Sequence, residues 1–236
     1  MRTNIREIKF PQTPAEAVTL KKRFKSAYFS GGTYLAAGKS TDIELLVDLN
    51  RLLTSGISSN ERSAIIGAGI TLRELSDYFQ ATEYSAISDC VRMSCASKNI
   101  RNHRTIGGEV AQGRPDSEIL ICFYALRAVL QAFNSESSSV EIGGWTNEGI
   151  IERVEIPLQD LGGISVQRFS TLKSVPGFVT AIGVRRGGSG KNREKLVLGN
   201  AKDRVLNILI EQGYQVKKMG GGKLRRQVFM SSLLKR

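Results

Sequence analysis

Residues 100–118 read IRNHRTIGGEVAQGRPDSE, and this stretch is the most informative part of the chain. The paired glycines Gly107 and Gly108 let the backbone turn closely, and they let amide N–H groups approach a ligand without a Cβ in the way. Thr105 adds a hydroxyl group, and Arg101 and Arg104 add positive charge. Several such loops converging on one point would make a site for an anion such as a pyrophosphate.

Two further glycine loops precede this stretch. Residues 30–35 read SGGTYL between two expected strands, and residues 67–69 read GAG at the end of another. Taken alone, each pair of glycines is better explained by an ordinary turn. The sequence contains neither the G-x-G-x-x-G fingerprint after a first strand nor the G-x-x-x-x-G-K-[ST] motif, so it supports neither a Rossmann site nor a P-loop.

In their order, four stretches resemble the FAD-binding medium subunits of molybdenum hydroxylases, such as those of carbon monoxide dehydrogenase and xanthine dehydrogenase. They are SGGTYL with the later IELLVDLNRL, IIGAGITLREL at 65–75, the stretch 100–118, and IERVEIPL at 151–158. The resemblance implies an α+β fold. It places a two-subdomain FAD-binding domain of the vanillyl-alcohol-oxidase-like (PCMH) type in residues 1–160, with subdomains at about 1–54 and 55–160. A small α+β domain would occupy residues 161–236.

The resemblance also implies where FAD lies. The diphosphate is expected on the amides of residues 31–35 and of the loop at 105–108. Thr105 and Glu118 are expected near the ribityl chain or the flavin edge. Gly107 is expected to present its amide where a Cβ would meet the cofactor. Glu109 and Glu118 depart from the family, which usually has asparagine and aspartate at these positions. The residues expected to contact FAD are Ser30, Gly31, Gly32, Thr33, Tyr34, Leu35, Gly67, Thr105, Gly107, Gly108, Glu109 and Glu118.

By the same resemblance, the chain is a flavoprotein subunit that relays electrons. Iron–sulfur clusters on a small partner subunit would supply them, substrate oxidation would occur on a large molybdenum-cofactor subunit, and the acceptor would be NAD, a quinone or oxygen. With three cysteines the chain itself cannot bind a four-thiolate cluster, and no metal site is expected. No catalytic acid or base is assigned. FAD is expected to bind noncovalently, although His103 leaves a covalent bond open.

Composition bears on the alternatives. The net charge of +12 attracts polyanions, but the basic clusters lack interleaved aromatic residues. Solvated faces or a docking surface for an acidic partner therefore rank above nucleic-acid binding. The other alternative is a noncatalytic FAD- or nucleotide-binding module with an assembly or regulatory role. No membrane span or secretory signal is evident, which predicts a cytoplasmic protein with reduced cysteines.

Local patterns predict the elements that carry these loops. Thr71 with Glu74 forms a capping box that begins a helix. Residues 99–115 are expected to form a basic loop, followed by a helix over 116–127. In the C-terminal part, three strands near 165–169, 179–185 and 195–198 are expected to precede a helix over 202–211.

Overall fold

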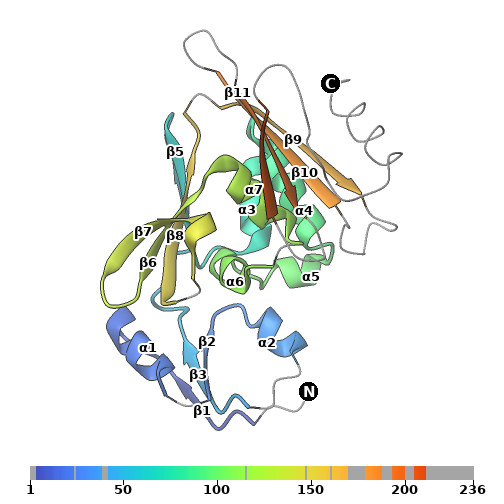
Figure 1. Ribbon diagram of the computed structural model, residues 1–236. Coiled ribbons are helices and arrows are strands. Elements are labelled where there is room, and N and C mark those ends of the chain that lie inside the picture. Colours follow the sequence, from blue (N-terminus) through green and yellow to red (C-terminus); the bar gives the residue numbers. More distant parts are fainter. Residues whose placement is uncertain are drawn as a thin grey trace.

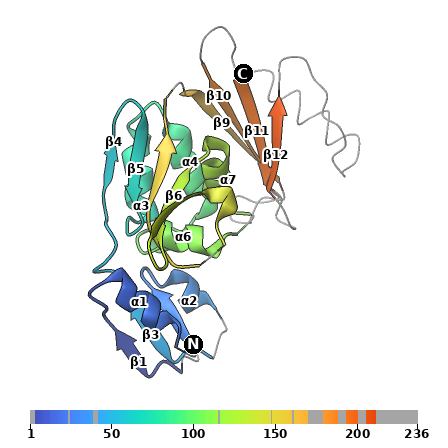
Figure 2. The same ribbon diagram turned by 60° about the vertical axis from the view of Figure 1, so that its left-hand side comes forward.

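The computed structural model of this chain describes residues 4–23, 25–38, 42–114, 116–146, 148–159, 161–169, 179–187, 193–199 and 205–210. These residues form three sheets that follow one another along the chain. Figures 1 and 2 show the N-terminal unit at one end, a helix-covered middle unit, and the C-terminal sheet at the other end. The mixture of helices and sheets confirms the expected α+β class.

The N-terminal unit is a small parallel sheet of order β1-β3-β2. Parallel neighbouring strands must be joined by a crossover connection. In this unit a helix lies between each strand and the next along the chain. Thr13 begins the first helix, because its hydroxyl accepts a hydrogen bond from the Glu16 amide at 3.2 Å and Pro14 occupies the first turn. Its elements are β1 (Glu7–Lys9), α1 (Pro14–Lys21), β2 (Ser26–Phe29), α2 (Thr33–Ala37) and β3 (Leu45–Asp48).

The middle unit is an antiparallel sheet of order β4-β5-β8-β6-β7 with helices packed against it. Its strands are β4 (Ile57–Ser59), β5 (Ser63–Gly67), β6 (Val129–Phe133), β7 (Ser137–Glu141) and β8 (Ile150–Pro157). Its helices are α3 (Leu72–Gln80), α4 (Ser85–Ser94), α5 (Lys98–Arg101), α6 (Ile106–Gln112), α7 (Glu118–Leu126) and the 3-10 helix η1 (Ile142–Gly144). The capping box predicted at Thr71 is present, with both of its reciprocal hydrogen bonds.

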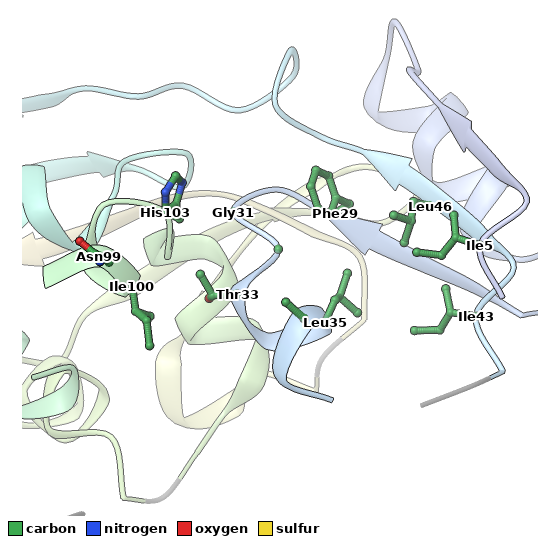
Figure 3. Close-up of a pocket in the computed structure, with 12 residues that line it drawn as sticks. Ile5, Phe29, Gly31, Thr33, Leu35, Ile43, Leu46, Asn99, Ile100 and His103 are labelled. Atoms are coloured by element: carbon green, nitrogen blue, oxygen red, sulfur yellow. The ribbon is translucent and has the colours of Figure 1, made fainter. Parts of the chain in front are cut away.

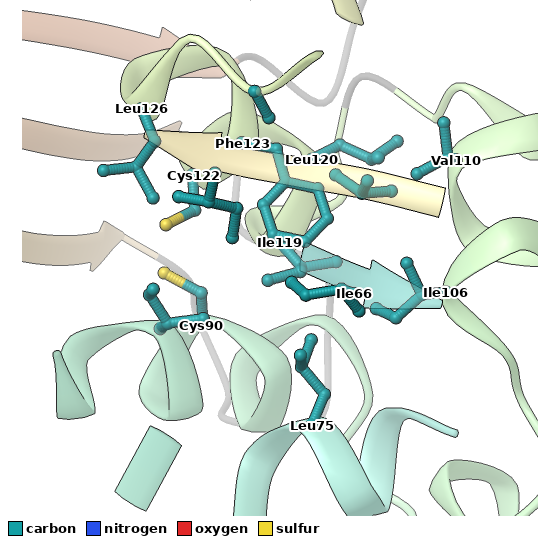
Figure 4. Close-up of a cluster of buried hydrophobic side chains, with 14 of the residues drawn as sticks. Ile66, Leu75, Cys90, Ile106, Val110, Ile119, Leu120, Cys122, Phe123 and Leu126 are labelled. Atoms are coloured by element: carbon teal, nitrogen blue, oxygen red, sulfur yellow. The ribbon is translucent and has the colours of Figure 1, made fainter. Parts of the chain in front are cut away.

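The main hydrophobic core lies between this sheet and helices α3, α4 and α7. Ile66 of the sheet, Leu75 of α3 and Phe123 of α7 are fully buried there (Figure 4). The sulfur atoms of Cys90 and Cys122 face one another within this core, and burial raises the pKa of the Cys90 thiol well above its usual value. Cys90 is therefore a protonated, packed thiol at neutral pH.

Two short helices, α5 and α6, and the turn between them occupy residues 98–112, where a loop was expected. Ser97 caps α5 and Thr105 caps α6 through hydrogen bonds to the Ile100 and Gly108 amides, at 3.4 and 3.2 Å. Helix α6 runs through two glycines, which are poor helix formers, because Ile106 and Val110 on one side of it are buried in the core. Tertiary packing thus outweighs the local preference that indicated a loop.

The C-terminal unit is an antiparallel sheet of order β12-β11-β10-β9. Its strands are β9 (Leu161–Phe169), β10 (Val179–Arg186), β11 (Arg193–Gly199) and β12 (Val205–Ile210). The helix expected over 202–211 is wrong where the structure describes it. Residues 205–210 read VLNILI and pair with 194–199 as a strand, which suits their high content of branched apolar side chains. Residues 202–204 and 211 lie outside the described residues.

Helix α7 of the middle unit packs against the C-terminal sheet. It lies against β10 and β11, and Ile182 and Val184 of β10 are buried in the main core. Within the described ranges, no helix is long and apolar enough to cross a membrane.

Candidate cofactor site

Two loops from distant parts of the sequence meet between the N-terminal and middle units. One follows β2 and contains Gly31 and Gly32, and the other joins α5 to α6 and contains His103. A Cβ placed on Gly31 would lie 1.7 Å from the carbonyl oxygen of His103, so only glycine permits this approach. Gly32 has a φ of 67° and begins α2, which again favours glycine.

The two loops enclose a cavity of about 270 Å³, here called the polar cavity. Nine of the twelve residues expected to contact FAD line it: Ser30, Gly31, Gly32, Thr33, Tyr34, Leu35, Thr105, Gly108 and Glu109. Arg104, which was expected only to add positive charge, also lines the cavity. The lining is completed by four residues that were not expected there: Tyr28, Ala37, Gln112 and Arg114. The structure therefore brings together the two glycine loops that were expected to share one anion.

A charged cluster forms one wall of the polar cavity. The Glu109 side chain is only 2% exposed, and its Oε1 accepts hydrogen bonds from Arg114 Nη2 at 2.9 Å and from the Ser117 hydroxyl at 2.6 Å. Its Oε2 lies 3.4 Å from Arg104 Nη1. Arg104 Nε in turn donates to the Thr33 hydroxyl at 3.4 Å, which joins the two loops. This cluster holds two arginines at the cavity in fixed positions.

Tyr28 and Arg114, which both line the polar cavity, have raised pKa values. Burial raises the pKa of Tyr28 to about 12, so its phenol stays neutral and keeps its proton. Desolvation lowers the pKa of Arg114, but the charges of Glu109 and Asp116 outweigh this effect and raise it overall. Arg114 is therefore a permanent cation at the cavity wall.

A second, larger cavity of about 440 Å³ adjoins the polar cavity and is here called the apolar cavity. Figure 3 shows Phe29, Leu46 and Ile43 toward one end and Ile100 with His103 toward the other. It shares Gly31, Gly32, Thr33 and Leu35 with the polar cavity. A ligand that has an anionic group and a flat apolar group could therefore occupy both cavities.

Gly107 has a different role from the one expected. Its amide donates to the Ala68 carbonyl at 2.8 Å, and a Cβ on it would lie 2.9 Å from the Ala68 Cβ. The expectation that this amide is open to the cofactor is therefore wrong. Gly67 likewise packs against the Thr54 carbonyl, 2.3 Å from where its Cβ would be. Neither glycine lines either cavity. Both occupy close contacts around the turn between β5 and α3, where Gly67 packs against Thr54 and Gly107 against Ala68.

Glu118 also lies away from both cavities. Its Oε1 is 3.1 Å from Arg168 Nε on β9, an ion pair whose geometry is not that of a hydrogen bond, and both side chains are buried. Arg168 Nη1 also donates to the Met93 carbonyl at 3.0 Å. Burial raises the pKa of Glu118, and the charge of Arg168 opposes this shift. In this structure Glu118 faces the C-terminal sheet.

Comparison with known proteins identifies the family. Residues 4–159 match the family described as the FAD binding domain in molybdopterin dehydrogenase, and the chain belongs to this family. Its cofactor is accordingly FAD. The uncharacterized protein YgfM of Escherichia coli K12 is 30% identical over 136 residues, which are 56% of this chain and 51% of YgfM. The chain thus spans about half the length of the curated relatives it matches.

Solved structures support the fold. A chain of carbon monoxide dehydrogenase from Hydrogenophaga pseudoflava matches with a TM-score of 0.71 and 20% identity, over 86% of this chain and 77% of that one. A chain of quinoline 2-oxidoreductase from Pseudomonas putida 86 matches with a TM-score of 0.72 and 19% identity, over 86% and 76%. These similarities confirm the fold expected from the sequence.

Proposed function

We propose that this chain is the flavoprotein subunit of a molybdenum-hydroxylase-like oxidoreductase, and that it holds FAD noncovalently in the polar and apolar cavities. This proposal rests on one observation. The loop after β2 and the segment from the α5–α6 loop into α6 meet around one cavity, which two arginines also line. A diphosphate carries about two negative charges, which such a wall of donors and cations can offset.

The residues that line the polar cavity would contact the cofactor in different ways. Gly31 lets the loop after β2 approach the His103 carbonyl, and Gly31, Gly32 and Gly108 line the cavity in which we place the diphosphate. Thr33 already accepts from Arg104, so its hydroxyl proton can be donated to a phosphate oxygen. The neutral Tyr28 phenol lies in the same lining. When bound, FAD supplies the redox chemistry, while the chain binds and orients it.

The apolar cavity suits one of the ring systems of the cofactor. Phe29, Leu35 and Ile100 offer flat or branched apolar surfaces, and Asn99 and His103 lie at one end (Figure 3). Ring systems are commonly held between apolar side chains, with a few polar groups that fix their orientation. We assign a ring end of FAD to this cavity because it adjoins the diphosphate position.

We further propose that electrons arrive from iron–sulfur clusters on a small partner subunit, that a large subunit carries the molybdenum cofactor, and that an external acceptor such as NAD, a quinone or oxygen removes them. The family assignment to molybdopterin dehydrogenases supports this.

The relay can be tested with the chain tagged and purified gently from its source cells. We expect it to elute with flavin, iron–sulfur and molybdenum in one complex. Chemically reduced iron–sulfur partner, added anaerobically to the flavin-loaded chain, should bleach the flavin absorbance. A chain that elutes alone, with a flavin that the partner cannot reduce, would instead support a noncatalytic FAD-binding module.

A further inference from the structure

The polar cavity contains a negative charge, which is unexpected in a site for a diphosphate. Glu109 lines the cavity and is almost completely buried, yet a phosphate group brought into the same space would repel it. A buried carboxylate needs strong partners, and Glu109 has three of them in Arg104, Arg114 and Ser117.

The two arginines face both Glu109 and the cavity. Their side chains are 19% and 32% exposed, against 2% for Glu109, so the carboxylate lies behind the guanidinium groups. Each guanidinium has five N–H donors and can bond to more than one oxygen at once. Among the residues that line the cavity, two cations and one anion leave a single net positive charge for a diphosphate that carries about two negative charges. Asp116 lies outside this lining, with its Oδ1 3.9 Å from Arg114 Nη1.

We propose that Glu109 is a buried counterion that sets the affinity of the diphosphate site: it holds Arg104 and Arg114 in place when the site is empty and competes with phosphate oxygens for them when it fills. This inference rests on the proposed function. It makes Glu109 a residue that weakens diphosphate binding, although it lies in the cofactor site. FAD would accordingly exchange more readily than in a site with a neutral amide at this position.

Glu109→Gln tests the proposal because it removes the charge and keeps the shape. The amide oxygen can still accept from Arg114 and Ser117, whereas the amide nitrogen cannot accept from Arg104, which is released toward the ligand. We expect the dissociation constant for FAD, measured by quenching of flavin fluorescence on the flavin-free chain, to fall by about tenfold or more. Added salt should weaken binding to this variant more steeply than to the wild type.

Arg114→Gln provides the opposite change. With one cation gone and Glu109 still charged, the dissociation constant for FAD should rise by about tenfold or more. The double variant Glu109→Gln/Arg114→Gln restores the net charge of the cavity, so its dissociation constant should return to within about threefold of the wild type. These two variants keep the proposal testable if Glu109→Gln alone does not fold.

A matched control is Glu44→Gln. Glu44 also lies between two cations, 2.7 Å from Lys25 Nζ and 3.4 Å from Arg6 Nη1, but it lines neither cavity. It changes the net charge of the chain by the same amount, and it should leave the dissociation constant for FAD within about twofold of the wild type. A general charge effect would instead appear equally in both variants.

Two simpler ligands separate the possible outcomes. ADP contains the diphosphate and riboflavin does not, so Glu109→Gln should tighten the binding of ADP and leave riboflavin unchanged. Equal or weaker ADP and FAD binding in Glu109→Gln would overturn the inference while FAD binding by the wild type still stood. A wild type that binds no FAD, with a Glu109→Gln variant that does, would support the inference. If neither binds FAD or ADP, both the inference and the proposed function are wrong.

Discussion

Gly31→Ala is expected to weaken FAD binding by on the order of 100-fold and to lower the free energy of unfolding by about 1–3 kcal/mol. The added methyl group would meet the His103 carbonyl oxygen at 1.7 Å and its carbon at 2.8 Å. These are backbone atoms, so the two loops must separate. Because the same loops enclose the polar cavity, its donors would move away from the diphosphate. Fluorescence titration with FAD measures the first effect, and denaturant unfolding of the flavin-free protein measures the second.

Gly56→Ala is the control for this substitution. It adds the same methyl group at a position where nothing lies within 4 Å and that lines neither cavity. It should change neither FAD affinity nor stability by more than a small amount. If Gly31→Ala bound FAD as tightly as Gly56→Ala, the contact between the two loops would not shape the cofactor site.

Arg168→Met is expected to cost about 3–5 kcal/mol of unfolding free energy, because it leaves the buried Glu118 carboxyl group without its cation. The substitution also removes the hydrogen bond to the Met93 carbonyl, which connects β9 to the end of α4. Both contacts join the C-terminal sheet to the middle unit. Denaturant unfolding followed by circular dichroism would measure the change.

Two controls accompany this prediction. Arg73→Met removes the cation from an exposed i,i+4 pair with Asp77 and should cost less than about 1 kcal/mol. Adding Glu118→Gln to Arg168→Met removes the carboxyl group that has lost its cation, and it should recover much of the lost stability. If Arg168→Met cost no more than Arg73→Met, the buried pair would not hold the C-terminal sheet in place.

The glycine loops show what the sequence could and could not predict. Their order along the chain led to the correct family and to most of the polar cavity. Their individual roles could not be predicted, because a glycine that approaches a ligand looks the same in sequence as one that approaches another backbone. Gly107 and Gly67 pack against Ala68 and Thr54, and Gly31 also approaches a backbone atom, the His103 carbonyl oxygen.

Side chains that act through tertiary contacts were harder still to predict. Arg114 reaches Glu109 only because the turn after α6 folds back, and the sequence shows no spacing that requires this. In the same way, α6 is stabilised by the burial of Ile106 and Val110, and the strand at 205–210 by its pairing with β11. Local preference alone predicted a loop for the first segment and a helix for the second.

We propose that this chain binds FAD noncovalently, with the diphosphate in the polar cavity. Titration of the flavin-free chain with FAD, alone and in the presence of ADP, measures both the stoichiometry and the place of the diphosphate. We expect saturable binding of about one FAD per chain, which ADP displaces because it shares the diphosphate. Absence of saturable binding, or bound FAD that excess ADP does not displace, would show that this assignment is wrong.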